Sequence, residues 1–115
     1  MQITRFNECK KYSPPKHDVT IHAMQLQSRE TGSGAPFWVG CSYYLPGAKA
    51  EMSATPLCKV YVMLEGTLTI ELKDGSKSEI SKGDSVYIAP NEEREIRNET
   101  NAVATMLVVM PYPPA

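Results

Sequence analysis

The residues of this sequence that are best suited to acid–base chemistry are its two histidines. His22 falls within residues 17–27, which alternate loosely and are expected to form a strand. An imidazole there would act as an acid or base, because its pKa lies nearest neutrality. A hydrogen-bonded histidine with an ordinary structural role is the alternative interpretation. His17 follows two prolines and is expected to be exposed to solvent.

The three cysteines, Cys9, Cys41 and Cys58, are an odd number and include no Cys-x-x-Cys pair. This pattern argues against a disulfide framework and against a zinc ribbon. A metal site built from His22, Cys41, Cys58 and Glu51 is conceivable, but no ligand spacing supports it. Buried, unreactive thiols are the expected state of Cys41 and Cys58, and a thiolate activated by nearby cations is the alternative for Cys58.

The elements that must position these residues are short strands, since turn signals recur roughly every 8–12 residues, as in all-β sandwiches and barrels. Residues 1–15 are expected to be an N-terminal arm, residues 28–36 a polar loop and residues 48–57 a less regular stretch. No stretch offers two helical turns with proper caps. Besides residues 17–27, the expected strands are 37–45, 60–64, 67–72, 85–89, 94–97 and 102–110. The fold class is therefore predicted to be all-β.

Two neighbouring segments carry the clearest strand patterns. Residues 60–64 form a continuous apolar run, which suits a strand buried on both faces. Residues 67–72 alternate strictly between apolar and polar, which is typical of a half-buried strand. The Asp74-Gly75 pair that follows has the preferred chemistry of a tight hairpin turn.

Composition limits the classes of function. A chain of 115 residues, of which 42% are apolar, is enough for one compact domain, residues 1–115. Twelve Lys and Arg against thirteen Asp and Glu leave a formal charge of −1, so no nucleic-acid partner is expected. No apolar run approaches the ~18 residues of a membrane-spanning helix, so no membrane association is expected. The first residues lack the apolar core of a signal peptide, which leads us to expect a cytoplasmic location.

Three landmarks occur in order between residues 46 and 98. They are Pro46-Gly47 followed by Val60-Tyr61-Val62-Met63-Leu64-Glu65-Gly66-Thr67, the Asp74-Gly75 hairpin, and Lys82-Gly83-Asp84-Ser85-Val86-Tyr87-Ile88-Ala89-Pro90 with Asn98 after it. This order resembles the two motifs of the cupin superfamily. The resemblance implies a double-stranded β-helix, or jelly-roll, cupin barrel over residues 37–110, preceded by the N-terminal arm of residues 1–15.

The resemblance also implies where a metal would be bound in such a barrel. The family's usual site takes two histidines spaced His-x-His, a glutamate a few residues later and a histidine from the second motif. In this sequence the His-x-His pair falls within residues 51–55, which contain no histidine, and Lys59 and Arg94 stand at the other two positions. Protonated amines and guanidinium groups cannot ligate a metal and would repel one. No metal and no other cofactor is therefore expected.

The substituted positions predict a cationic pocket. If Lys59 faces the barrel interior, strand alternation places Tyr61 and Met63 there too, and Arg94 should reach the same cavity. Two cations repel each other in a low-dielectric cup, a cost that a bound anion would offset. We therefore expect Arg94 and Lys59 to bind a carboxylate or phosphate, and Met63 and Met52 to be substrate-binding residues that would suit a flat apolar or aromatic part of the ligand. Cation heads that reach water, or that nearby acids neutralise, are the alternative.

The resulting functional prediction is a metal-independent cupin-type enzyme that acts on a small acidic molecule by proton transfer, as an isomerase, lyase or decarboxylase. Lys59, with its pKa lowered, would be the base or nucleophile. Tyr61 would donate to an oxyanion, and His22 would be a further acid or base. The alternatives are a non-catalytic ligand-binding or sensor domain, and a metal-dependent cupin enzyme with unusual ligands.

A second copy of the chain is the expected protein partner. The resemblance implies a homodimer in which the N-terminal arm crosses to the other subunit. The aromatic strand at residues 37–44 and the arm at residues 1–15 both offer apolar surface for such a contact. Covering edge strands is a physical reason for a small barrel to pair in this way.

Overall fold

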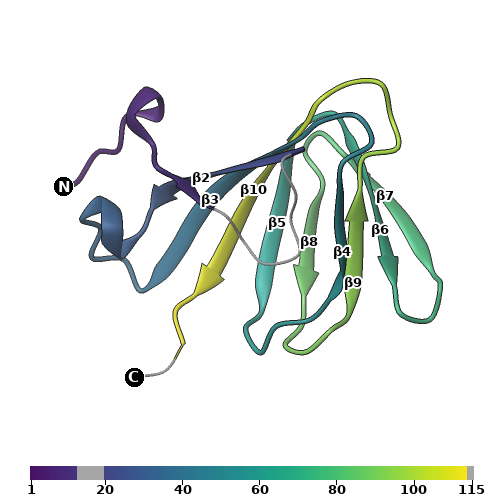
Figure 1. Cartoon of the computed structure of the whole chain (residues 1–115). Coiled ribbons are helices and arrows are strands. Elements are labelled where there is room, and N and C mark those ends of the chain that lie inside the picture. The colour runs from purple at the N-terminus through teal and green to yellow at the C-terminus, as the bar shows by residue number, and fades with distance from the viewer. Residues whose placement is uncertain (13–19, 114–115) are drawn as a thin grey trace.

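The computed structural model describes residues 1–12 and 20–113. Over these residues the chain forms ten strands and two short 3₁₀ turns, arranged as two antiparallel sheets that face each other (Figure 1). The first sheet has six strands in the order β1-β2-β3-β10-β5-β8, and the second has four in the order β4-β9-β6-β7. The bounds are η1 Phe6–Glu8, β1 Lys11–Tyr12, β2 Ile21–Gln27, η2 Arg29–Thr31, β3 Phe37–Tyr44, β4 Lys49–Ser53, β5 Lys59–Glu65, β6 Thr67–Leu72, β7 Lys77–Ser81, β8 Ser85–Ile88, β9 Arg94–Arg97 and β10 Ala104–Pro111. The expected all-β jelly-roll barrel is confirmed.

Strand β4 lies in the stretch that was expected to be less regular. Lys49 and Glu51 are exposed while Ala50 is buried, so the strand does alternate. Its only apolar inward residue at that point is a small alanine, which gives little signal in the sequence. The pairing of β4 with β9 also shifts register between Ala50 and Ser53. A bulge of this kind breaks the two-residue period by which a strand is found.

The continuous apolar run of β5 suggested a strand that is buried on both faces, but only one face of β5 is buried. Tyr61 and Met63 are 3% and 1% exposed, whereas Val60 and Leu64 are each 38% exposed. The reason is that β5 belongs to one layer of a two-layer barrel, so only alternate side chains meet the opposite sheet. The outward apolar side chains therefore form a surface rather than a core.

The hydrophobic core lies between the two sheets and takes its side chains from both. Its largest fully buried side chains are Tyr44, Met63 and Met106 from the larger sheet and Leu68 from the smaller one. Each large apolar side chain buried here contributes roughly 1.5–3 kcal/mol of transfer free energy. This core fills one part of the barrel and leaves the cavity described below in the other part.

Two turns join the strands at the places that the sequence indicated. The β6–β7 hairpin turns at Asp74-Gly75, where the Asp74 carboxylate accepts hydrogen bonds from the Ser76 backbone N–H at 2.9 Å and from its hydroxyl at 2.6 Å. Gly66 joins β5 to β6 with φ of 76°, a left-handed conformation that favours glycine. A Cβ atom at this position would lie 2.7 Å from the carbonyl oxygen of Val103, so a side chain is excluded there as well.

The N-terminal arm follows the outside of the larger sheet and then joins its edge. Strand β1 pairs with β2 through Lys11–Met24 and Tyr12–Ala23. Phe6 packs edge-on against Tyr43 of β3, with ring centroids 6.3 Å apart. Residues 13–15 of the expected arm, residues 17–19 of the expected strand and His17 lie outside the described residues. Neither 3₁₀ turn in the described chain is long or apolar enough to span a membrane.

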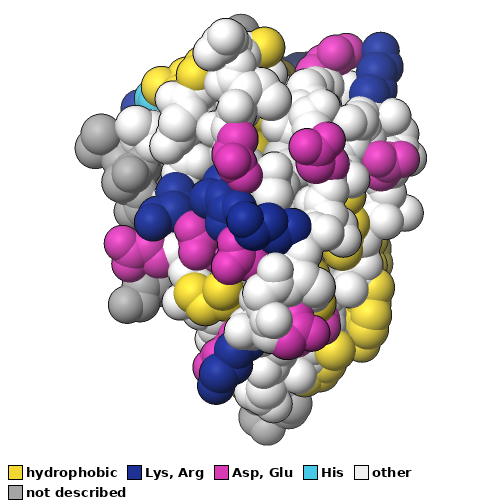
Figure 2. Space-filling model, turned by 90° about the vertical axis from the view of Figure 1, so that its right-hand side faces the viewer, with side chains coloured by type: hydrophobic (Ala, Val, Ile, Leu, Met, Phe, Trp, Pro, Cys, Tyr) yellow, Lys and Arg dark blue, Asp and Glu magenta, His cyan; other side chains and the backbone are white. Residues whose placement is uncertain are grey.

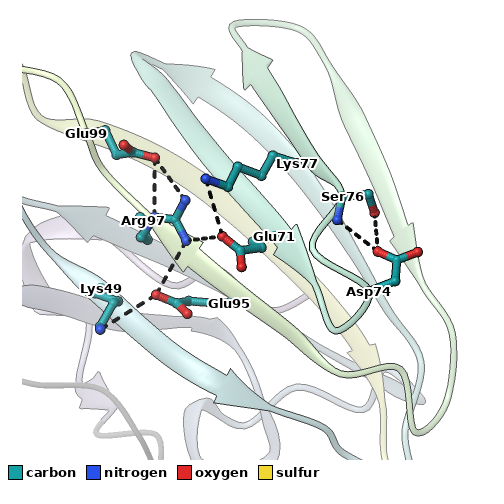
Figure 3. A network of polar contacts seen from close by, with 8 residues as sticks. All are labelled: Lys49, Glu71, Asp74, Ser76, Lys77, Glu95, Arg97 and Glu99. Carbon is teal, nitrogen blue, oxygen red and sulfur yellow. Dashed lines mark hydrogen bonds and ion pairs between the residues drawn. The ribbon is translucent and has the colours of Figure 1, made fainter.

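The outer face of the smaller sheet is charged (Figure 2). At its centre the Arg97 guanidinium donates to Glu71 at 2.9 Å and to Glu99 at 3.0 Å, and lies 3.5 Å from Glu95 (Figure 3). Lys49 and Lys77 extend this row of alternating charges through Glu95 and Glu71. Hydrogen bonds from Glu71 and Glu99 raise the pKa of Arg97. The charged groups of this face therefore pair with one another at the solvated surface and do not form a buried binding site.

Candidate ligand-binding site

A cavity of about 460 Å³ opens between the two sheets. This volume suits a small organic molecule, since ligand pockets run from about 300 to 1,000 Å³. By surface area most of the wall is apolar, and both sheets and the N-terminal arm contribute residues to it. The apolar lining residues are Ala23, Trp38, Ala50, Ala54, Leu57, Ile96, Met106, Val108 and Met110, and the polar ones are Tyr12, Ser42, Tyr44, Glu51, Ser53, Thr55, Lys59, Tyr61 and Arg94.

Arg94, the first residue of β9, is held rigidly inside this cavity and is only 7% exposed. Its Nη1 donates to the backbone carbonyl of Ser53 at 2.8 Å. Its Nη2 and Nε donate to the hydroxyl oxygen of Tyr61 at 3.0 and 3.3 Å. Both partners are neutral oxygens, so they fix the plane of the guanidinium without cancelling its charge.

No acidic side chain compensates the two cations within the part of the chain that the structure describes. The ion pairs found there join other basic residues to carboxylates, and none contains Arg94 or Lys59. Glu51 also lines the cavity but is exposed and forms no ion pair with either of them. A buried charge without a counter-charge is costly, and an anion bound beside it would remove that cost.

Lys59 begins β5 and contributes to the same wall. Burial, and to a lesser extent the positive charge of Arg94, together lower the pKa of its amine from 10.5 to about 8. At neutral pH about one amine in ten is then unprotonated. Lys59 can therefore act as a point charge toward an anion or, in its free-amine form, accept a proton.

Two tyrosines complete the polar end of the cavity. Tyr61 is 3% exposed, and because its oxygen accepts two hydrogen bonds from Arg94, its own hydroxyl hydrogen must point elsewhere. Burial raises the pKa of Tyr44, with the nearby Tyr61 adding to the effect, so this phenol stays protonated. The polar end thus contains phenolic O–H groups beside the two cations, an arrangement suited to binding oxygen atoms that carry negative charge.

The structure places the expected site residues in three different environments. Lys59, Tyr61 and Arg94 come together in the cavity as expected. Met63 faces inward but lies deeper in the hydrophobic core and does not line the cavity. Met52 does not line it either, because the bulge after Ala50 shifts the phase of β4 and turns Ser53 inward instead.

His22 is not part of this site. It is exposed on β2 opposite Tyr43, between the buried residues Ile21 and Ala23. Strand alternation therefore puts the imidazole on the outer face of the larger sheet, away from the cavity. The expectation that His22 acts there as an acid or base is corrected by this geometry.

The described residues do not fit the metal site that the fold implies. Lys59 and Arg94 occupy two of the family's ligand positions, and no group of three or more His, Cys, Asp or Glu side chains gathers within the described ranges 1–12 and 20–113. Cys41, on the outer face of the larger sheet, is 4% exposed, and burial raises the pKa of its thiol. The conceivable set of His22, Cys41, Cys58 and Glu51 is therefore not brought together.

Two aromatic residues of the wall, Tyr12 and Trp38, were not expected in the site. Trp38 has the same strand parity as Ser42 and Tyr44, which also line the cavity, so alternation along β3 was an available signal. Tyr12 reaches the cavity because β1 adds to the edge of the larger sheet beside β2. Nothing local in the sequence indicates that pairing.

Comparison with known proteins agrees with this architecture. The model of the cupin domain matches residues 42–110. A Mycobacterium tuberculosis protein named β-D-galactosidase Rv1717 is 39% identical over the whole chain and 97% of its own length.

Two solved structures show the same fold. The polyketide cyclase RemF from Streptomyces resistomycificus superposes with a TM-score of 0.84 at 20% identity, over 99% of this chain and 82% of its own. A cupin 2 conserved barrel domain protein from Salinispora arenicola gives a TM-score of 0.77 at 20% identity, over 97% and 89% of the two chains. The landmarks in the sequence, the two-sheet barrel and these matches lead to one conclusion: this chain belongs to the cupin family.

Proposed function

We propose that this protein binds a small organic acid in its barrel and acts on it by proton transfer, without using the family's usual metal. The observation that carries the proposal is the pair of cations, Arg94 and Lys59, that share the cavity with no ion-pair partner among the described residues. Arg94 offers a planar donor group fixed by Ser53 and Tyr61, which suits a carboxylate or phosphate.

The same residues support a proton-transfer step. The free amine of Lys59 takes the proton from a carbon next to the substrate's carboxylate, and the electron pair of the broken C–H bond moves into that acid group as an enolate. Arg94 and the Tyr61 hydroxyl stabilise the negative charge that develops on its oxygens. The ammonium of Lys59 then returns the proton to the same carbon or to a neighbouring one, which gives exchange or isomerisation.

A non-catalytic ligand-binding or sensor domain is the alternative that shares the same cavity. It differs in one respect, since a sensor would bind the anion and leave its C–H bonds intact. A metal-dependent cupin with unusual ligands is the other alternative. Elemental analysis of the purified protein tests it, and a transition metal at a near-stoichiometric level would contradict the proposal.

The name of the relative that is 39% identical favours hydrolysis of β-galactosides as a second candidate. Most glycosidases use two carboxylates on opposite sides of the scissile bond. The described part of the cavity wall has one carboxylate, that of Glu51. Release of nitrophenol from nitrophenyl β-D-galactopyranoside, lost in Glu51→Gln, would establish this candidate, and no release by the wild-type protein would remove it.

The first experiment is a thermal-shift screen of small carboxylates and phosphorylated compounds. A ligand that binds only the folded state raises the Tm by mass action. Arg94→Met and Lys59→Met should lose the shift, whereas Lys73→Met, which changes a lysine that is 78% exposed, should keep it. A full shift retained in both cavity variants would contradict the anion site.

The second experiment separates the enzyme from the sensor. Compounds that raise the Tm are incubated with the protein in D₂O, and NMR follows replacement of their C–H protons by deuterium. The proposal expects exchange next to the acid group in the wild type and none in Lys59→Met. Binding without exchange for every ligand would contradict the catalytic step and favour the sensor.

A further inference from the structure

The end of the cavity formed by the arm and β3 is aromatic. Tyr12 of the arm and Trp38 of β3 both line the cavity, and their rings contact each other with centroids 5.1 Å apart and planes 55° apart. Trp38 is 7% exposed. Together they form one apolar wall that the proton-transfer chemistry does not use.

Because Gly40 has no side chain, the Trp38 indole can lie against the backbone of β3. A Cβ atom added at Gly40 would overlap the Cη2 and Cζ3 atoms of Trp38 and would lie 3.0 Å from the carbonyl oxygen of Met24. The far end of the Trp38 ring system therefore rests directly on the backbone of the strand. Any larger residue at position 40 would displace the ring from this seat.

The register of the larger sheet gives the spacing between this aromatic wall and the cationic end. Tyr61 pairs with Val108, and Val108 pairs with Gly40. Adjacent strands lie about 4.8 Å apart, so the backbones at Tyr61 and Gly40 are about 10 Å apart. Val108 lines the cavity between them. Across these three strands the cavity is therefore lined first by the Tyr61 phenol that binds Arg94, then by the aliphatic Val108, and then by the Trp38 ring over Gly40.

We infer that the ligand of this cavity is a flat ring that carries a carboxylate or phosphate, with the acid group at Arg94 and the ring against Trp38 and Tyr12. The inference rests on the proposed function for the acid group of the ligand. It adds the chemical class of the rest of the ligand, which is a planar ring. The ~10 Å between the two backbones leaves room for a short linker between the ring and the acid group, and the linker carbon next to the acid group carries the C–H bond that the proposed proton transfer breaks. Aromatic contacts favour a planar ring over a saturated one, because edge and face geometry adds to the burial of apolar area.

The chain contains one tryptophan, so Trp38 itself can report on the ring. The probes are phenylacetate, cyclohexylacetate and acetate, which share one carboxylate with a C–H bond on the carbon next to it and differ in the group attached to that carbon. We expect phenylacetate to change Trp38 fluorescence on titration and to bind about tenfold more tightly than acetate, with cyclohexylacetate between them. Isothermal titration calorimetry measures all three affinities independently of the fluorescence.

Two variants test the wall. Tyr12→Ala removes a ring that is outside the hydrophobic core, and Gly40→Ala displaces the indole from its seat. Both substitutions should lower the affinity for phenylacetate several-fold and leave the affinity for acetate within about twofold. Gly34→Ala is the matched control, because a Cβ atom there meets nothing within 4 Å.

The possible results separate this inference from the proposed function. Equal affinities for phenylacetate and acetate in the wild type, or an equal loss of both affinities in Tyr12→Ala, would contradict the inferred ring of the ligand while leaving the anion site intact. Binding of none of the three probes, or full binding to Arg94→Met, would overturn the anion site and the ring together.

Discussion

The proposed chemistry of this barrel depends on which groups accept the hydrogen bonds of Arg94. A buried guanidinium normally meets a carboxylate, which would neutralise it and close the site. Arg94 instead donates to the Ser53 carbonyl and to the Tyr61 hydroxyl, two neutral acceptors that hold it in one orientation. Its hydrogen-bonding geometry is thus fixed before a ligand arrives, while its charge remains available. This is the combination expected of an anion receptor rather than of a structural ion pair.

Lys59 should make the stability of the protein depend on pH in a defined window. Its pKa is about 8 in the folded state against 10.5 ordinarily, so between these values the unfolded chain binds more protons. Stability should therefore rise as the pH increases from about 8 to 10.5, and the cost of the buried charge should be fully present at pH 7. Because Lys59 is partly exposed, this cost is on the order of 1–2 kcal/mol after allowance for solvent screening.

Urea unfolding of the wild type and of Lys59→Met at several pH values measures this effect. The variant should be more stable than the wild type at pH 7, and the difference should shrink as the pH approaches 10. A stability difference that stays constant across this range would show that Lys59 titrates normally. In the wild type the affinity for a bound carboxylate should fall above pH 8, because the ammonium that attracts it is lost.

For single residues, the sequence predicted which side chains face the barrel interior. It did not predict whether an inward side chain lies at the cavity or in the filled core. Lys59, Tyr61 and Met63 alternate on one face of β5, and all three do point inward. Only the first two reach the cavity, because Met63 lies further along the strand where the core is filled. Depth along a strand depends on what the opposite sheet places there, and strand periodicity contains no information about that.

Among the elements, the strands with strong alternation or long apolar runs were predicted, whereas β1, β4 and β7 were not among the predicted strand ranges. Thr67–Leu72 and the Asp74-Gly75 turn formed as predicted. Strand β4 escaped detection because its register shifts between Ala50 and Ser53. That same shift brings Ser53 to the cavity, where its carbonyl binds Arg94. The irregularity that hid the strand from the sequence is therefore part of the site.

The link between β5 and β6 should tolerate no side chain at Gly66. Alanine there would be strained by the positive φ of 76° and would lie 2.7 Å from the Val103 carbonyl oxygen, a backbone atom that cannot move aside easily. Gly66→Ala should therefore reduce the free energy of unfolding by at least about 2 kcal/mol. Chemical denaturation measures the loss.

Gly34→Ala is the control for this prediction, since it lies in an exposed loop where a Cβ atom meets nothing within 4 Å. It should change stability by no more than about 0.5 kcal/mol. Equal effects of the two substitutions would mean that the close approach of Gly66 to Val103 does not constrain the fold. Because Gly66 does not line the cavity, folded Gly66→Ala protein should still bind the same anions.

At the scale of the whole molecule, the two sheets present opposite kinds of outer surface. The smaller sheet carries the Arg97 network of alternating charges (Figure 3). The larger sheet carries a row of apolar side chains in register across four strands, formed by Val39, Val109, Val60 and Tyr87. Val60 and Tyr87 are 38% and 62% exposed. An uncharged surface of this kind can pack against its own copy without burying an unpaired charge.

The homodimer expected from the sequence remains a prediction, and this apolar row is the surface on which to test it. A standard interface buries about 800 Å² per partner, and the four-strand row provides an apolar centre for one. Val60→Lys or Tyr87→Lys would place a charge at that centre and should convert a dimer to a monomer in sedimentation velocity experiments. Glu79→Lys, on the exposed face of the smaller sheet, should leave the dimer intact. Because these outward positions do not line the cavity, the monomeric variants should still bind the anion. A wild-type protein that sediments as a monomer at high concentration would contradict the dimer. That result would leave the proposed site in the barrel unaffected.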